Sequence, residues 1–311
     1  MGPDKSVKND HVFPYPSALG SLLYTRLTRP DCLVAISILC RFMQNPQPQH
    51  WAAVKDVFRY LKGTINRGLL YRSSGLTLSQ PWTITLWVDS DYGTEPDTRR
   101  SRGGYLAFLN KNLVAFNSVL QRGLTKPPFD DGVREEFHGV KFPKTPMDGE
   151  PLPSMATGTC DAEYLALSMA VKELIWLYML LRTMGINVQK PCVVYEDNRA
   201  CIKIAENATA MKRTKHIDIR HHFLREHAEN GTIKILPVAT KDQLADVMTK
   251  VLGKVLFLCF RDSITSDVDL TGFNWSSSPP AIMETPQRAP HIALQAAIDH
   301  ANAQAVLHCR S

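Results

Sequence analysis

ITLWVD, residues 84–89, and CVVYED, residues 192–197, are two short apolar runs that each end on an aspartate. Their β-branched and aromatic residues favour strands, so each run predicts a strand with an acid at its carboxyl end. Because elements of a mixed sheet can converge at one end of the sheet, Asp89 and Asp197 are expected to lie close together.

Two further acids stand at the heads of predicted helices. CDAEYLALSMAVKELIWLYML, residues 160–180, repeats apolar residues at steps of three and four, which predicts a helix with one packed face. Glu163 lies in line with that stripe, and Asp246 in QLADVMTK stands in a last helix that is predicted to begin near Gln243. Each acid alone has an ordinary explanation, since acids complement the helix dipole and aspartates cap helices.

Taken together, Asp89, Glu163, Asp197 and Asp246 predict a divalent-metal site. Carboxylates a few ångströms apart cannot all stay ionised without cations. Two Mg²⁺ or Mn²⁺ ions about 3.5–4 Å apart supply the activated water, the neutralised phosphate and the stabilised leaving oxygen that phosphodiester hydrolysis needs. Both ions prefer oxygen ligands, so these residue types suit the chemistry.

Two neighbouring acids leave alternatives open. Asp91 shares a face with Asp89 if the strand continues, so the residues alone do not choose between them. Glu196 directly precedes Asp197 and should point to the opposite face of the sheet. There it is either buried, which is unfavourable for a carboxylate, or exposed at an edge.

The chain has 311 residues, 44% hydrophobic and 21% charged, which is enough for a sizeable core in two folded pieces with tails. Residues 17–62 predict three helices, the third with a single buried apolar stripe. The stripe consists of Trp51, Val54, Phe58 and Leu61. Three β-rich runs within residues 82–118, with a turn at 110–112, predict an antiparallel start, and later strands alternate with helices.

This pattern predicts an α/β (α+β) fold with a mixed sheet and three segments. A helical module occupies residues 13–75, and the sheet domain occupies residues 82–262 with a proline-rich insertion at about 123–158. Residues 263–311 are expected to be a linker and a poorly ordered tail.

The net charge of +6 is unevenly distributed, because residues 17–72 contain eight Lys or Arg against two Asp. A second basic stretch predicts phosphate contacts by Lys212, Arg213, Lys215 and Arg220, although a solvated helical surface explains the charge equally well. The seven cysteines form no CxxC pair and are expected to be reduced. No signal core or membrane span is expected, which favours a soluble intracellular protein.

Six motifs in register carry a family resemblance. They are VDSDYG, RRSRGGYLAFLN, TCDAEYLALSMAVKELIWL, YEDNRACIKIA, RTKHIDIRHHFLREHAENGTIKI and QLADVMTKVL. In this order they resemble the ribonuclease H region of copia-type LTR retrotransposon polyproteins. The upstream stretch resembles the segment that follows the reverse transcriptase palm, so the resemblance covers about residues 13–262.

The resemblance implies a ribonuclease H fold, a five-stranded mixed sheet flanked by helices, that cleaves the RNA strand of RNA/DNA hybrids with two Mg²⁺. It places the four catalytic and metal-binding acids on Asp89, Glu163, Asp197 and Asp246, and so favours Asp89 over Asp91. The order Asp, Glu, Asp, Asp distinguishes this fold from integrases, which use Asp, Asp, Glu. The resemblance also implies that the helical module is like the thumb or connection of a reverse transcriptase. The location that it implies is the cytoplasm, in virus-like particles, the nucleus, or both.

Departures from the family pattern define the competing hypotheses. The polymerase palm motif is missing, so no polymerase activity is expected unless palm and fingers are supplied in trans. The insertion before Glu163 could be looped out or could displace that acid, and Glu196 stands where relatives carry a small or thiol residue. An inactive remnant that binds nucleic acid is therefore the alternative to an enzyme, and an interaction scaffold built on the helical module is a third reading.

Overall fold

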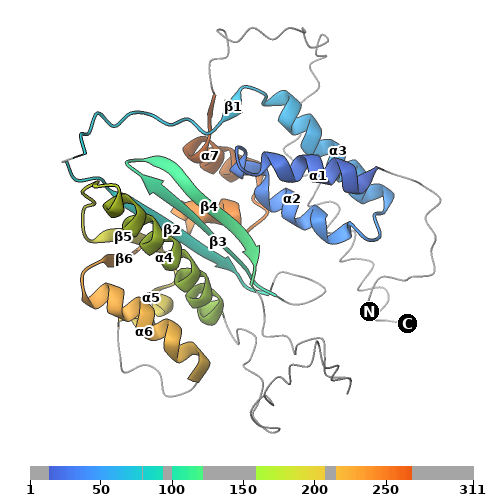
Figure 1. Cartoon of the computed structure of the whole chain (residues 1–311). Helices are drawn as coiled ribbons and strands as arrows, with labels where there is room; N and C mark the ends of the chain where they lie inside the picture. Colours follow the sequence, from blue (N-terminus) through green and yellow to red (C-terminus); the bar gives the residue numbers. More distant parts are fainter. Residues whose placement is uncertain (1–13, 79, 94–99, 122–158, 207–214, 268–311) are drawn as a thin grey trace, which may run out of the picture.

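The computed structural model of the chain describes residues 14–78, 80–93, 100–121, 159–206 and 215–267, with side chains from His222 onward in the last range. Within these ranges a five-stranded sheet forms the centre of the molecule (Figure 1). Its strands, in chain order, are β2 (Ile84–Asp91), β3 (Arg102–Leu109), β4 (Asn112–Leu120), β5 (Cys192–Glu196) and β6 (Ile233–Pro237).

The strand order across the sheet is β4-β3-β2-β5-β6. The first three strands of the sequence pair antiparallel, whereas β5 lies parallel to both β2 and β6. Asn110 and Lys111 adopt positive φ in the turn between β3 and β4, as a two-residue hairpin turn requires. The predicted fold class, a five-stranded mixed sheet flanked by helices, is confirmed.

One face of the sheet is covered by α4 (Thr159–Thr183), α5 (Arg199–Glu206) and α6 (Lys215–Glu229). The predicted stripe of α4 is buried from Leu167 to Leu181, but Met184 lies beyond the end of the helix and is 62% exposed. By length and hydropathy α4 is the one helix of the described ranges that could cross a membrane. Since 56% of that apolar window is buried inside the protein, α4 has the character of a core helix.

The other face is covered by α1 (Tyr15–Thr25), α2 (Leu33–Leu39), α3 (Pro48–Gly63) and α7 (Lys254–Ile264). Residues of these helices form one hydrophobic cluster with Leu106, Phe108 and Leu113 of the sheet. The helical module and the sheet therefore share a core, and the division into two domains stays a prediction.

The predicted stripe of α3 is shifted by one residue in the structure. Val54 is buried, but Trp51 and Leu61 are half-buried and Phe58 is 38% exposed. The residues that face inward are His50, Ala53, Val54, Val57 and Tyr60. Polar partners explain the shift, because His50 stacks on Phe42 and Tyr60 binds a buried aspartate.

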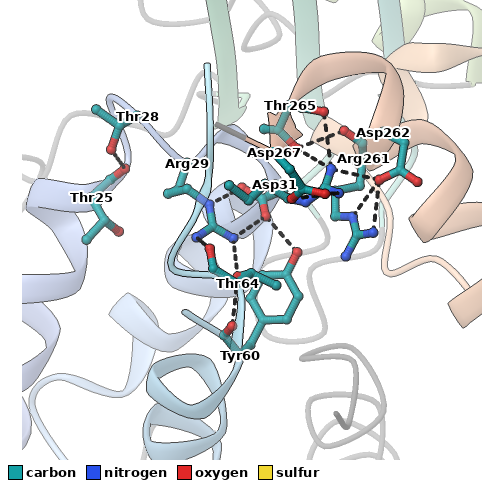
Figure 2. A network of polar contacts seen from close by, with 11 residues as sticks. Thr25, Thr28, Arg29, Asp31, Tyr60, Thr64, Arg261, Asp262, Thr265 and Asp267 are labelled. Carbon is teal, nitrogen blue, oxygen red and sulfur yellow. Dashed lines mark hydrogen bonds and ion pairs between the residues drawn. The ribbon is translucent and has the colours of Figure 1, made fainter. Parts of the chain in front are cut away.

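That aspartate, Asp31, belongs to a buried polar network inside the helical module (Figure 2). Arg29 donates to both of its carboxylate oxygens, at 3.0 and 2.8 Å, and the Tyr60 hydroxyl donates to it at 2.7 Å. Arg29 also donates to the Thr64 carbonyl at the end of α3. The network fixes α3 against the turn that precedes α2.

The C-terminal boundary predicted at residue 262 falls inside α7, which continues to Ile264. A short strand follows this helix, since β7 (Ser266–Asp267) pairs with β1 (Arg67–Gly68). Arg67 donates to the Asp262 carboxylate at 2.8 Å and so ties the end of the helical module to α7. The predicted insertion and the tail from residue 268 lie outside the described residues.

Candidate metal centre

Asp89 lies at the centre of the candidate site and is 1% exposed in β2. Its two carboxylate oxygens have different partners. The Thr249 hydroxyl donates to one, and the Lys250 ammonium lies 3.1 Å from the other. Both partners follow the segment that contains Asp246, so the far end of the chain reaches back to β2.

Three of the four predicted acids come together in the structure. Asp89, Glu163 and Asp197 each offer a ligand atom, and these atoms lie within 4.8 Å of one another. Glu163 is 4% exposed and Asp197 half-buried, so the cluster is buried on the sheet side and open beside Asp197. Asp91, the competitor of Asp89, is not part of this group within the described ranges.

Two consecutive glycines of β3 allow α4 and η5 (Leu244–Met248) to pack closely on its two faces, beside Asp89. Gly104 is the cross-strand partner of Asp89, and a Cβ atom there would lie 2.5 Å from Met248 Cβ and 2.9 Å from Thr249 Cγ2. On the opposite face a Cβ atom on Gly103 would lie 3.2 Å from Ala166 Cβ of α4. The absence of side chains at these positions therefore brings Asp246 and Glu163 toward Asp89.

Gln121, the last described residue before the insertion, binds the N-terminal part of α4. Its Nε2 donates to the Ala162 carbonyl at 2.7 Å and to the Ser90 hydroxyl at 3.1 Å. Ala162 directly precedes Glu163, and Ser90 directly follows Asp89. The contact holds Glu163 at the cluster although residues 122–158 separate β4 from α4 in the sequence.

The segment that contains Asp246 differs from the prediction. It is a 3₁₀ segment, η5 (Leu244–Met248), and the longer helix α7 begins only at Lys254. Gln243 is fully buried at its start, where its side chain accepts from the Ala245 N–H and donates to the Val88 carbonyl at 2.8 Å. This glutamine binds the backbone of β2, and that binding outweighs the α-helical propensity of the segment.

The cluster is electrostatically strained in the absence of metal. Burial raises the pKa of Glu163 to about 11, with the charges of Glu196 and Asp89 adding to the effect. Burial together with the charge of Asp89 raises the pKa of Asp246 to about 7. Burial disfavours the charged form of Lys250, but the carboxylates of Asp89 and Asp246 outweigh it and raise the pKa of this lysine.

The donor set fits a divalent cation. Oε2 of Glu163 is buried and has no hydrogen-bond donor within the part of the chain that the structure describes. A buried carboxylate oxygen without a donor is costly, and a cation among three carboxylates removes that cost. Oxygen-only ligands suit Mg²⁺ or Mn²⁺ better than softer metals.

Glu196 is the fifth acid in this region, and the structure places it fully buried. Its Oε1 accepts from the Asn198 N–H at 3.1 Å, which shapes the turn that presents Asp197. Burial raises the pKa of Glu196 well above its usual value. Of the two placements that the sequence left open, the buried one is correct.

The predicted phosphate-binding residues cannot be placed around this cluster. Lys212 and Arg213 lie outside the described residues, and Lys215 and Arg220 belong to the part of α6 whose side chains are not described. Their role stays a prediction.

Sequence reasoning missed the roles of Thr249, Lys250, Gln121 and Gln243, although three of these four residues lie within QLADVMTK, the motif that contains Asp246.

Comparisons with known proteins agree with the motifs, although no family model matches the chain. It is 34% identical to the retrovirus-related Pol polyprotein from transposon TNT 1-94 of Nicotiana tabacum, over 79% of this chain and 16% of that protein. It is 30% identical to the corresponding polyprotein from transposon RE2 of Arabidopsis thaliana, over 80% of this chain and 15% of that protein. Among solved structures, LC11-RNase H1 aligns at 12% identity with a TM-score of 0.32, over 54% of this chain and 92% of that one.

The order and directions of the five strands, with helices on both faces, give the five-stranded mixed sheet that the resemblance to ribonuclease H implies. The chain is thus similar, over most of its length, to a segment of retrovirus-related Pol polyproteins of transposons. It spans 16% of the length of the first relative and 15% of the second, so it corresponds to a small part of such a polyprotein.

Proposed function

We propose that this chain is a metal-dependent ribonuclease of the ribonuclease H type that hydrolyses the RNA strand of RNA/DNA hybrids within a copia-type retrotransposon polyprotein. One observation carries the proposal. Asp89, Glu163 and Asp197 come from three separate elements and still place their ligand atoms within 4.8 Å, with a buried carboxylate oxygen that lacks a donor in the described ranges.

In this proposal the four acids hold two Mg²⁺ or Mn²⁺ ions. When bound, such ions neutralise the reacting phosphate and activate a water molecule. Asp89 and Glu163 form the buried side of the site, and half-buried Asp197 marks the side from which substrate approaches. Lys212, Arg213, Lys215 and Arg220 are proposed to contact phosphates, which would set affinity and salt dependence.

Polymerase activity is not part of the proposal, because the motifs that carry the resemblance lie in the ribonuclease H region and in the segment that follows the polymerase palm. The missing palm and fingers are proposed as a partner in trans. Such an assembly would supply the hybrid on which the nuclease acts.

A second candidate function is a remnant that binds nucleic acid without cleaving it. The observation that favours it is the ion pair of Lys250 with both Asp89 and Asp246, which already neutralises part of the cluster without metal. A remnant of this kind retains the fold and the basic surface but does not assemble two metals.

Cleavage of a hybrid with a labelled RNA strand tests the proposal through a matched pair of variants. Asp246→Asn should lower the cleavage rate at least about 100-fold, because Asp246 would be a charged ligand of the metal, and losing stabilisation of the transition state by a few kcal/mol slows the reaction by that factor. Asp242→Asn, which changes an exposed acid four residues earlier, should cleave at the wild-type rate.

A mobility-shift measurement on the same hybrid separates the two candidate functions. The nuclease proposal expects wild-type binding together with cleavage. Salt-dependent binding without cleavage by the wild-type chain, unchanged in Asp246→Asn, would instead establish the remnant.

A further inference from the structure

Lys250 is bound to two of the four acids at once. Its Nζ lies 2.7 Å from Asp246 Oδ1, a charge-assisted hydrogen-bond distance, and 3.1 Å from Asp89 Oδ1, within the general range for N–H···O bonds. The two carboxylates are buried, with side chains 1% and 7% exposed, whereas the lysine side chain is 31% exposed. The ammonium therefore reaches the acids from the solvent side.

The same contact separates the site into two halves that share Asp89. Asp89, Glu163 and Asp197 form a group with mutually close ligand atoms, and Glu163 Oε2 lacks a donor among the described residues. Asp246 is not in that group, and its carboxylate is paired with Lys250. In the first half, the buried oxygen of Glu163 has no hydrogen-bond donor in the described ranges. The Asp89–Asp246 half is already paired with the Lys250 ammonium.

Local structure keeps the lysine in this position. Lys250 follows Asp246 by four residues, and its backbone N–H donates to the Asp246 carbonyl at 2.9 Å. The adjacent Thr249 is 3% exposed and donates its hydroxyl to the second oxygen of Asp89. Gly104 opposite Asp89 leaves the room that Met248 and Thr249 fill.

We propose that Lys250 is an internal cation of the Asp89–Asp246 half, so that the chain binds one divalent ion readily and a second only by displacing the lysine ammonium. An ion entering between these two carboxylates must displace an ammonium that is hydrogen-bonded to both, whereas an ion entering beside Glu163 meets a buried oxygen that accepts no hydrogen bond in the described ranges. The inference rests on the proposed metal site and assigns Lys250 as a positioning residue that sets the affinity of the second ion.

Mn²⁺ binding to the full chain, measured by calorimetry and by electron paramagnetic resonance, tests this inference without an activity readout. The wild-type protein should bind one Mn²⁺ more tightly than the second. Lys250→Met should tighten the second ion by about tenfold or more, the effect of removing a competing charged hydrogen bond. Lys250→Arg keeps the charge and should bind the second ion as weakly as the wild type.

Lys254→Met is the matched control, because Lys254 is an exposed lysine four residues further along the chain. It removes the same charge without a contact to the acids and should leave both affinities unchanged. If Lys250→Met needs metal to fold, the Mn²⁺ concentration at its folding midpoint, followed by circular dichroism, reports the same affinity.

Two results would overturn the role of Lys250: equal second-ion affinity in the wild type and Lys250→Met, or equal affinity in Lys250→Arg and Lys250→Met. The first ion tests the proposed metal site separately. The proposed metal site is wrong if the wild type binds no Mn²⁺, or if Asp197→Asn does not weaken the Mn²⁺ that it binds. This conclusion does not depend on the results for the lysine variants.

Discussion

At the scale of single residues, the carboxylates of the cluster differ in how each is neutralised. Asp89 has a threonine and a lysine as partners, Asp246 has the lysine, and Glu163 retains a buried oxygen without a donor in the described ranges. Burial in turn raises the pKa of Glu163 and Asp246. The metal-free protein therefore binds protons where metal ions are proposed to bind.

Stability of the metal-free protein should fall as pH rises. The pKa of Asp246 is higher in the folded protein, about 7, than its ordinary 3.8, so the folded state binds this proton more tightly. The resulting stabilisation is complete below the unfolded pKa and is lost as pH rises through the folded one. Thermal unfolding in EDTA should give a lower Tm at about pH 8 than at about pH 5.

Asp246→Asn provides the control for this pH dependence. The variant removes one of the groups whose pKa is raised and should make the fall in Tm smaller, and excess Mg²⁺ should do the same for the wild type. A wild-type Tm that rises over this interval in EDTA would count against the raised pKa of Asp246.

The four acids could be picked out from the sequence because each stands near the end of a detectable apolar run, although β2 continues past Asp89 to Asp91 instead of closing on Asp89. Their partners could not be predicted in this way. Thr249 and Lys250 contact Asp89 from 160 and 161 positions further along the chain. Periodicity describes one element at a time and contains no information about such distant contacts.

At the scale of elements, close backbone approach decides the geometry of the site. Gly103 and Gly104 allow α4 and η5 to pack on opposite faces of β3, next to Asp89. The α4 stripe was predictable from spacing because α4 packs through apolar residues. The 3₁₀ form of η5 was not, because it depends on buried Gln243 binding the Val88 carbonyl.

Gly104→Ala should damage both stability and activity. The added methyl group overlaps Met248 Cβ and forces η5 away from the sheet, which moves Asp246 and Lys250. Overpacking of this kind costs about 1–3 kcal/mol. Urea unfolding measures the stability, and hybrid cleavage should fall by a larger factor than the stability loss alone explains.

Gly20→Ala is the control for the glycine substitution. Gly20 lies in α1, and a Cβ atom added there would have no neighbouring atom within 4 Å, so alanine should stabilise the protein by up to about 1 kcal/mol. Wild-type stability and cleavage in Gly104→Ala would show that η5 does not depend on this close approach.

At the scale of the whole molecule, the helical module shares a hydrophobic core with one face of the sheet, while α4, α5 and α6 form a second core on the other face. The sequence predicted the three helices of the module but not their position on the sheet, since amphipathic spacing identifies a buried face without identifying what covers it. The shift of the α3 stripe has the same origin. Its inward face includes His50 and Tyr60, whose polar and aromatic partners lie on other segments.

The buried network of Asp31 should be a major support of this arrangement. Asp31→Asn breaks the charge pair with Arg29, whose side chain is 8% exposed, and leaves that guanidinium buried without its counter-charge. Such a loss costs about 3–5 kcal/mol. Asp56→Asn removes the partner of Arg59 in an ion pair near the surface and should cost about 0–1 kcal/mol.

Chemical denaturation of both variants, followed by circular dichroism, measures the difference. Equal stability losses in Asp31→Asn and Asp56→Asn would show that the network does not hold the module together.

The most direct test of the central claim is a cleavage assay on an RNA/DNA hybrid with the purified wild-type chain. The carboxylate cluster predicts that the RNA strand is cut in Mg²⁺ or Mn²⁺, stays intact in EDTA, and that the DNA strand stays intact throughout. An RNA strand left intact by folded protein that binds the hybrid in Mg²⁺ and in Mn²⁺ would contradict the account.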